Sequence, residues 1–425
     1  MILTDDIAGP TYSDPTSGRR VRGSGSRASL AWVLAILPVL IAVSCAAPAR
    51  NAVPRELASK AQIPGLSDVR DWGDRFSSVL QRGLVQSIHQ ARAVNPRGGG
   101  DEDGSLSVLA LSGGGANGAF GAGFLCGWSA AGARPTFKLV TGISTGALLA
   151  PFAFLGPEYD ETLRTAFTTI STKDIYRERS LLEILLNSEY LADTRPLARM
   201  IARLVDEKVF TAVAEAHQQG RRLLVGTTNF DAGKLVIWDM GAIATSGRPG
   251  ALELFRKVML ASAALPIAFP PVHFEVEADG RRYEETHVDG GLVTQVFFYG
   301  CTLDLPAAAR ETGLSGGGPV RLYVVRNGHL TNSWRLTPRG MLPITDRTIN
   351  SFLGAQAIGD LYRIYVFAKR DGIEFNYACI PDDYVPAATE SFDRTEMNRL
   401  FDLGFESARA GYVWHKLPPG YVDTP

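Results

Sequence analysis

One serine lies in a pentapeptide whose form suits a nucleophile. Residues 142–146 read Gly-Ile-Ser-Thr-Gly, and this Gly-x-Ser-x-Gly pattern occurs in sharp strand-to-helix turns that expose a serine hydroxyl. Gly142 and Gly146 carry no side chain that would clash in such a turn. The dipole of the following helix favours negative charge near Ser144. An ordinary turn in which Ser144 caps the helix is the alternative.

Three consecutive glycines, Gly113, Gly114 and Gly115, form a second chemical feature upstream of the serine. Their N–H groups can converge on an anion, either a phosphate or the oxyanion of an acyl transfer. With Gly118 they also fit a dinucleotide fingerprint, but that motif requires an acidic residue about 20 positions on. Residues 104–157 contain no Asp or Glu, and no Gly-Lys-Ser/Thr follows. Both nucleotide-binding motifs are therefore excluded, and close helix–strand packing is the remaining alternative.

A catalytic serine needs a base, and the chain offers two kinds. Asp289 follows an expected strand, and Gly290 and Gly291 let its carboxylate approach another loop. An aspartate with an ordinary pKa of about 4 is a weak base, but burial in an apolar pocket raises that pKa. A simple Asp-Gly turn is the alternative. A Ser-His-Asp triad would instead need a histidine after the serine in the chain. The candidates are His217, His273, His287, His329 and His415, and none of them lies in a distinctive turn.

The elements around these motifs predict a parallel sheet. A strand over 106–111, the glycine turn, a helix to 132, a strand over 137–141, the serine turn and a helix over 147–155 form a βαβα succession. Strands are also expected over 221–229, 234–239 and 320–325, with a hairpin over 273–287. Helices are expected within 158–220 and over 249–264, 347–369 and 395–412. We therefore expect an α/β fold of three layers, α/β/α, with a mainly parallel central sheet and helical N- and C-terminal additions.

Together these motifs resemble the patatin-like phospholipase family. That family has a Gly-Gly-Gly-x-Arg/Lys-Gly loop, a Gly-x-Ser-x-Gly turn and a downstream Asp-Gly-Gly or Asp-Gly-Ala, which residues 113–118, 142–146 and 289–291 match in order. Residues 261–271, Ala-Ser-Ala-Ala-Leu-Pro-Ile-Ala-Phe-Pro-Pro, are similar to a fourth family stretch. The resemblance covers residues 105–300. It departs at Asn117, where the family has a basic residue, although an amide there can still donate a hydrogen bond.

The resemblance implies specific roles. Ser144 would be the nucleophile and Asp289 the general base, with an oxyanion hole from Gly113, Gly114 and Gly115 and no metal or organic cofactor. The reaction would be hydrolysis of acyl esters of phospholipids or related lipids, so a lipid substrate and a membrane surface are the expected partners. Two alternatives stay open: a Ser-His-Asp α/β-hydrolase esterase, and a lipid-anchored lipid-binding protein without catalysis.

The composition excludes other functions. The 425 residues are 45% apolar and 20% charged, with 43 basic against 44 acidic side chains. A net charge of −1 argues against a nucleic-acid partner, because phosphate binding requires a basic surface. The six histidines and four cysteines show no metal-ligand spacing. Cys126, Cys301 and Cys379 form no disulfide framework.

The N-terminal region predicts export. Four arginines precede the apolar run Leu30–Val43, which ends in small residues, as in a secretory signal peptide. The run is shorter than the about 20 residues of a membrane-spanning helix. Cys45 resembles the lipidated cysteine of a bacterial lipoprotein, which would hold the protein on the periplasmic side of the cell envelope or on the outer membrane. Cleavage after Ala46 or Ala47 and a retained membrane anchor are the alternatives.

These observations divide the chain into four segments. Residues 1–47 are the leader or anchor, and residues 48–104 a helical lead-in that ends in a Gly-rich acidic connector. Residues 105–330 are the catalytic domain. Residues 331–425 are a C-terminal helical extension packed on that domain.

Overall fold

The structure is a computed structural model, and it describes residues 50–95, 104–178, 192–313, 318–330, 336–388, 390 and 392–422. The predicted leader, Cys45 and residues 179–191, which are part of the region 158–220 where helices are expected, lie outside the described residues. Arg50–Pro425 form one compact unit. Among the residues described, no helix is both long and apolar enough to cross a membrane.

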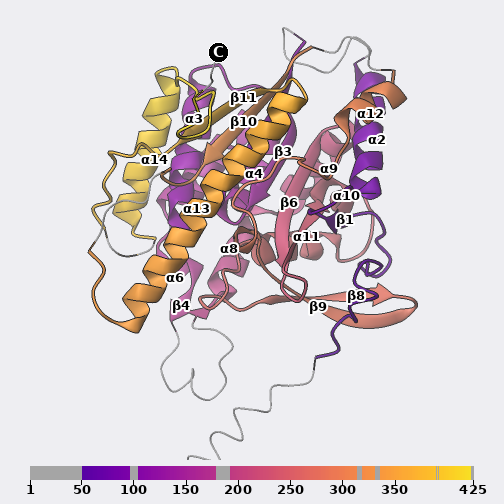
Figure 1. Ribbon diagram of the computed structural model, residues 1–425, viewed down its shortest axis with the longest axis horizontal. Coiled ribbons are helices and arrows are strands. Elements are labelled where there is room, and N and C mark those ends of the chain that lie inside the picture. The colour runs from indigo at the N-terminus through magenta and orange to yellow at the C-terminus, as the bar shows by residue number, and fades with distance from the viewer. Residues whose placement is uncertain are drawn as a thin grey trace, which may run out of the picture. The chain divides into compact units, whose positions relative to one another are not determined.

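Nine strands of the described chain form one sheet whose centre is parallel (Figure 1). Five strands run parallel, in the order β6, β3, β2, β10, β11. Their bounds are Arg222–Asn229 (β6), Phe137–Ile143 (β3), Leu106–Leu111 (β2), Val320–Arg326 (β10) and Glu374–Cys379 (β11). The mainly parallel sheet expected from the βαβα pattern is confirmed.

Antiparallel strands pair with both edges of β6 and complete the sheet. β7 (Lys234–Asp239) pairs with β6, and β1 (Arg70–Trp72) pairs with β7. β8 (Val272–Ala278) and β9 (Arg281–Asp289) form the expected hairpin, and the end of β9 also pairs with β6. A separate antiparallel pair joins β4 (Arg177–Glu178) to β5 (Ala192–Asp193).

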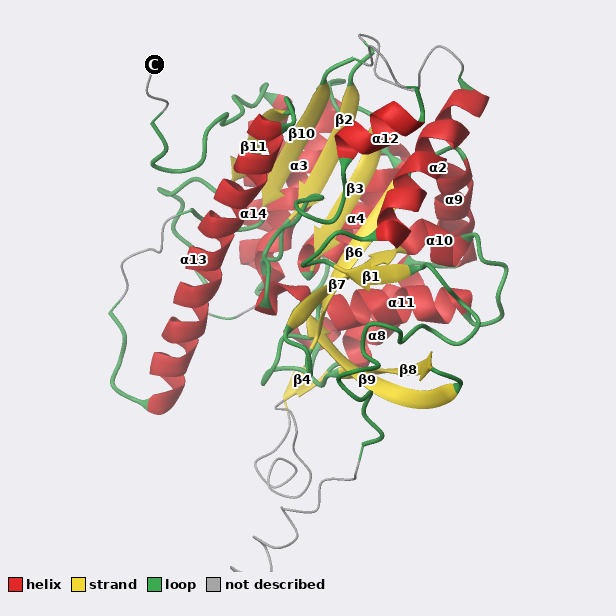
Figure 2. Ribbon diagram, turned by 45° about the vertical axis from the view of Figure 1, so that its right-hand side comes forward, coloured by secondary structure: helices red, strands yellow, loops and turns green. Residues whose placement is uncertain are grey.

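Alternating side chains of the strands face two hydrophobic layers. Leu109 and Leu111 of β2 lie in one layer, and Val108 and Ala110 lie in the other, as the period of a strand requires. Figure 2 shows α3 and α4 behind the strands and α12 in front of them. The result is a three-layer α/β/α arrangement, in which the parallel strands are buried on both faces.

Each layer has its own helices. The first layer contains α3 (Gly118–Ala130), α4 (Thr145–Leu155), α5 (Asp160–Thr168), α6 (Thr172–Ile175), α8 (Arg195–Leu204), α9 (Glu207–Gln218), α10 (Met240–Ala244), α11 (Ala251–Ser262) and α14 (Arg394–Arg409). The second contains α2 (Ser78–Val94), α12 (Leu305–Glu311) and α13 (Met341–Arg370). Three short 3₁₀ turns lie at η1 (Gly115–Asn117), η2 (Pro157–Tyr159) and η3 (Gly290–Leu292).

Glycines bring α3 and α14 into close contact. A methyl group at Gly123 or Gly127 of α3 would overlap the carbonyl groups of Phe401 and Phe405 of α14. Gly404 of α14 meets the Phe120 carbonyl of α3 in the same way. The Gly- and Ala-rich sequence of α3, which precedes the serine motif, is therefore explained by helix packing.

The C-terminal segment contains both expected helices and one strand that the sequence pattern did not reveal. β11 pairs in parallel with β10 over its whole length, and a strand of this kind gains its stability from a partner about 50 residues away rather than from local sequence. α13 begins at Met341, before the expected start at 347. Pro343 lies in its first turn, where a helix loses no backbone hydrogen bond to proline.

Candidate active site

Ser144 occupies the turn between β3 and α4. Its backbone has φ 54° and ψ −123°, a conformation that is rare for a residue with a side chain. A methyl group at Gly142 would lie 2.5 Å from the Gly146 carbonyl oxygen, and one at Gly146 would overlap the Leu111 carbonyl. Both flanking glycines are therefore required, and the turn leaves the Ser144 side chain half-buried at the carboxyl end of β3.

Strand β6 brings Asp289 to this serine. Along one edge of β6, β3 pairs up to Ile143 opposite Gly226, and β9 then pairs from Asp289 opposite Thr227. β9 thus continues along the edge that β3 leaves when it turns at Ser144. The Ser144 hydroxyl donates a hydrogen bond of 2.6 Å to Asp289 Oδ2, across 145 positions of sequence.

The Asp289 carboxylate is buried and has few partners. Only 3% of the residue is exposed, and besides Ser144 it accepts a bond of 2.7 Å from the Gly291 N–H. Burial raises the pKa of Asp289 from 3.8 to about 7, against the lowering effect of these two hydrogen bonds. Position 290 requires glycine, because a methyl group there would lie 2.6 Å from the Gly226 carbonyl oxygen.

The stretch 261–271 supports both residues from one side. Ser262 accepts a hydrogen bond of 3.0 Å from the Ser144 N–H and donates one of 2.7 Å to the Gly226 carbonyl. The Ala264 carbonyl accepts the N–H of Asp289 at 2.9 Å. The family resemblance includes this stretch but implies no role for Ser262, because the contacts of Ser262 depend on the fold.

The glycine loop lies directly beside the serine. A methyl group at Gly113 would lie 3.2 Å from the Ser144 Cβ. The Gly113 N–H donates to the Gln295 carbonyl at 2.9 Å and is thereby occupied. Gly114 and Gly115 are exposed, and within the described residues neither N–H has a hydrogen-bond acceptor. The loop therefore offers two unoccupied N–H groups rather than the three that the sequence suggested.

Asn327, at the end of β10, holds the glycine loop in place. A methyl group at Gly114 would overlap the Asn327 carbonyl. The Asn327 amide donates to the Ser112 carbonyl at 2.8 Å, and its N–H donates to the Ser112 hydroxyl at 2.8 Å. Asn327 lies 215 positions after Ser112, which it contacts, and no local pattern in the sequence marks it.

The end of the glycine loop begins α3. A methyl group at Gly118 would overlap the Thr145 hydroxyl at the start of α4, so the first turns of α3 and α4 are in contact. Asn117, the last residue of η1, is half-buried directly before α3, and its side chain caps no backbone N–H. The position that is basic in the family is thus a neutral amide at the rim of the loop.

The histidines have other partners. Buried His287 lies 3.0 Å from Glu285 and 2.8 Å from Thr227. His217 lies near Asp239, at 3.5 Å, and His329 bonds the Pro381 carbonyl. Across the described part of the chain, no histidine forms a hydrogen bond with Ser144. The geometry therefore favours a serine–aspartate pair over a triad.

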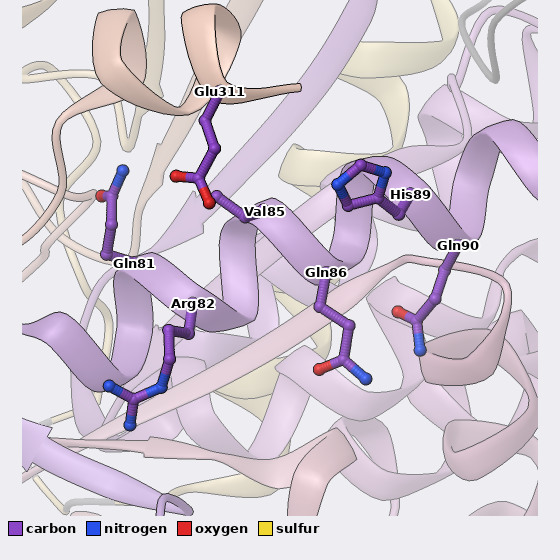
Figure 3. A pocket seen from close by; sticks show the side chains of 7 residues that line it. All are labelled: Gln81, Arg82, Val85, Gln86, His89, Gln90 and Glu311. Carbon is purple, nitrogen blue, oxygen red and sulfur yellow. The ribbon is translucent and has the colours of Figure 1, made fainter. Parts of the chain in front are cut away.

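A separate pocket lies away from these residues. It is lined by α2 and by Glu311 of α12, with Gln81, Arg82 and His89 among the α2 side chains (Figure 3). None of the candidate residues contributes to it. The described residues also include no group of three or more His, Cys, Asp or Glu side chains placed to hold a metal ion.

A family model matches the central part of the chain. No curated protein matches the chain. The crystal structure of VipD from Legionella pneumophila is similar over 72% of this chain and 66% of its own, with 11% sequence identity and a TM-score of 0.35. The chain thus spans just under two thirds of that protein. Residues 109–299 match the sequence model of the patatin-like phospholipases, so this part of the chain is similar to that family.

Proposed function

We propose that the protein is a serine hydrolase that cleaves acyl esters of phospholipids or related lipids through Ser144 and Asp289. The observation that carries the proposal is the 2.6 Å hydrogen bond from the Ser144 hydroxyl to a buried Asp289 carboxylate. A carboxylate whose pKa is raised to about 7 by burial accepts a proton far more readily than an exposed one. The family match over residues 109–299 supports the same chemistry.

In the first half-reaction, the Ser144 oxygen attacks the ester carbonyl carbon while its proton passes to Asp289. The carbonyl oxygen becomes an oxyanion, and the free N–H groups of Gly114 and Gly115 donate hydrogen bonds to it. When the tetrahedral intermediate collapses, the bond to the alcohol breaks and Asp289 returns the proton to the leaving oxygen. The alcohol departs, and the acyl group stays on Ser144.

In the second half-reaction, water attacks the acyl-enzyme and Asp289 takes a proton from it. A second tetrahedral intermediate uses the same two N–H groups. It collapses to the free fatty acid, and Asp289 returns the proton to the Ser144 oxygen. Fixed donors help because they stabilise charge that develops only in the transition state.

Three variants test the proposal. We expect Ser144→Ala and Asp289→Asn each to abolish hydrolysis of phospholipid vesicles. Mass spectrometry of the released fatty acids measures this hydrolysis. His287→Gln is the matched control, because His287 lies two residues from Asp289 but bonds Glu285 and Thr227. Loss of activity in a folded His287→Gln variant would favour the Ser-His-Asp hydrolase instead.

A fluorophosphonate probe separates an enzyme from a lipid-binding protein without catalysis. The probe forms a covalent adduct with an activated serine, so we expect labelling of Ser144 in the wild type and none in Ser144→Ala. Folded wild-type protein that binds lipid vesicles but takes up no probe would favour the non-catalytic alternative.

We also propose that the protein is exported and attached to the cell envelope through lipidated Cys45. The support is the sequence of residues 19–45, with its arginines, its apolar run and its small residues before the cysteine. The test is incorporation of a labelled fatty acid in bacterial cells. Wild type should be labelled and found in the membrane fraction, and Cys45→Ser should not be labelled.

A further inference from the structure

The segment that follows the Asp-Gly-Gly turn lies between the two halves of the site. Thr294, Gln295 and Val296 are all buried. They connect the turn that carries Asp289 to the apolar residues 296–299 of the second layer. The proposed mechanism uses none of these side chains, yet Gln295 contacts both the glycine loop and the Asp-Gly-Gly turn.

Gln295 forms one bond to each half. Its carbonyl accepts the Gly113 N–H at 2.9 Å, and its side-chain amide donates to the Gly291 carbonyl at 2.7 Å. The Gly291 N–H in turn donates to Asp289 at 2.7 Å. A single residue therefore joins the loop that would hold the oxyanion to the turn that holds the base.

Asp360 of α13 fixes this residue in place. Its carboxylate accepts the Gln295 N–H at 2.7 Å. Burial raises the pKa of Asp360, and Thr294 and the Val296 N–H also lower it against this effect. Only 1% of Asp360 is exposed. Its ion-pair partner, Arg363, lies 3.0 Å away with a side chain that is 62% exposed. The charge is thus stabilised mainly by donors of the 294–296 segment.

We propose that Asp360 and Gln295 are positioning residues for the reaction: Asp360 fixes Gln295, and Gln295 sets the placement of the glycine loop relative to Asp289. This inference rests on the proposed function. The Gly113 N–H is turned to Gln295, and this bond constrains the orientation of the adjoining Gly114 and Gly115 peptides. The long helix α13, which belongs to the predicted C-terminal extension (Figure 1), thereby becomes part of the support of the site.

A buried carboxylate is an expensive way to stabilise a fold, because removing it from water costs several kcal/mol that apolar packing does not. The Gln295 N–H, 2.7 Å from this carboxylate, gives it a strong, directional bond in return. Asparagine at this position has a single acceptor oxygen, and its NH₂ group would face donors. Asp360→Asn therefore keeps the size of the side chain and loosens the 294–296 segment.

The experiment measures kcat, KM and thermal stability in four variants with a soluble chromogenic ester. Asp360→Asn replaces the charged acceptor of the Gln295 N–H by an amide. Gln295→Met removes the side-chain bond to the Gly291 carbonyl and keeps the backbone bond to Gly113. Arg363→Met removes only the exposed partner of Asp360. Tyr362→Phe removes another bond of α13, the 2.7 Å contact with the Pro419 carbonyl. A misplacement near 1 Å costs up to about 100-fold in rate, so we expect kcat to fall by about 10- to 100-fold in the first two variants.

The expected result is this loss of kcat with KM changed less than about twofold, since the oxyanion donors act mainly in the transition state. The rate at which Ser144 reacts with fluorophosphonate should fall in parallel. Arg363→Met and Tyr362→Phe should keep the wild-type kcat.

A purely structural role predicts a different result, in which Asp360→Asn and Gln295→Met melt at a lower temperature but keep the wild-type kcat per folded molecule. That result overturns the inference. If Asp360→Asn does not fold, Gln295→Met decides by the same comparison. A wild-type protein without hydrolysis or labelling refutes the proposed function itself, whereas an active wild type with unaffected variants refutes only the positioning role.

Discussion

Replacement of Asp289 by asparagine tests the electrostatic state of the proposed base. Burial raises the pKa of this carboxyl from 3.8 to about 7 in the folded protein, and unfolding returns it to water. Between these two values, the folded protein holds a proton that the unfolded chain has lost. The free energy of unfolding therefore falls as the pH rises through this range, and it levels off above the folded-state pKa. Asparagine does not ionise, so the variant lacks this contribution.

The expected size follows from the two pKa values. Fully ionised, the buried carboxylate costs about 4 kcal/mol relative to its neutral form. Between about pH 5 and about pH 8.5, the same linkage lowers the free energy of unfolding of the wild type by about 3 kcal/mol. We therefore expect Asp289→Asn to gain stability over the wild type by about 3 kcal/mol more at the higher pH than at the lower one.

Urea unfolding followed by circular dichroism measures this difference. Ser144→Ala is the matched control, because it also removes a proposed catalytic group but keeps the carboxylate. The free energy of unfolding of Ser144→Ala should fall with pH at least as much as that of the wild type. The reason is that the Ser144 hydrogen bond lowers the Asp289 pKa, and the variant lacks this bond. Parallel pH curves for wild type and Asp289→Asn would refute the reasoning.

The same titration controls the rate. The base acts only when ionised, so kcat/KM for a neutral ester should rise with pH and level off above about pH 7. The profile of the free enzyme reports this pKa directly. An acid limb at about pH 4, typical of an exposed aspartate, would contradict the burial of the base.

Two further substitutions test the surroundings of the pair. Gly114→Ala places a methyl group on the Asn327 carbonyl. It should lower kcat by about 10²–10³-fold in the chromogenic assay, as loss of an oxyanion donor does. The control Gly359→Ala, whose methyl group meets nothing within 4 Å, should keep full activity. Glu285→Gln leaves Arg70 buried without the carboxylate that lies 2.5 Å away, and it should lower the free energy of unfolding in urea by about 3–5 kcal/mol. Asp279→Asn, in the exposed pair with Lys60, should lower it by less than about 1 kcal/mol. Equal effects of the two substitutions would contradict the role of burial.

Several features of the site could be predicted from the sequence because they depend on short-range geometry. A turn with φ 54° at Ser144 needs small residues beside it, so Gly142 and Gly146 mark the turn without knowledge of the fold. The apolar patterns of 106–111 and 234–239 predict two strands with the same bounds that the structure shows. The succession of these elements predicts a parallel sheet, since a strand–helix–strand unit has few ways to pack.

Other features depend on contacts between distant parts of the chain, and only the tertiary structure decides them. The register of β6 places Asp289 beside Ser144, and the packing around it raises its pKa. The bond from Gly113 to Gln295 occupies one of the three glycine N–H groups that were expected to bind an oxyanion. The contact of Asp360 with Gln295 joins α13 to the site. The sequence by itself therefore determined which residues could react, because their types and local turns are short-range properties, whereas their partners and protonation depend on long-range packing.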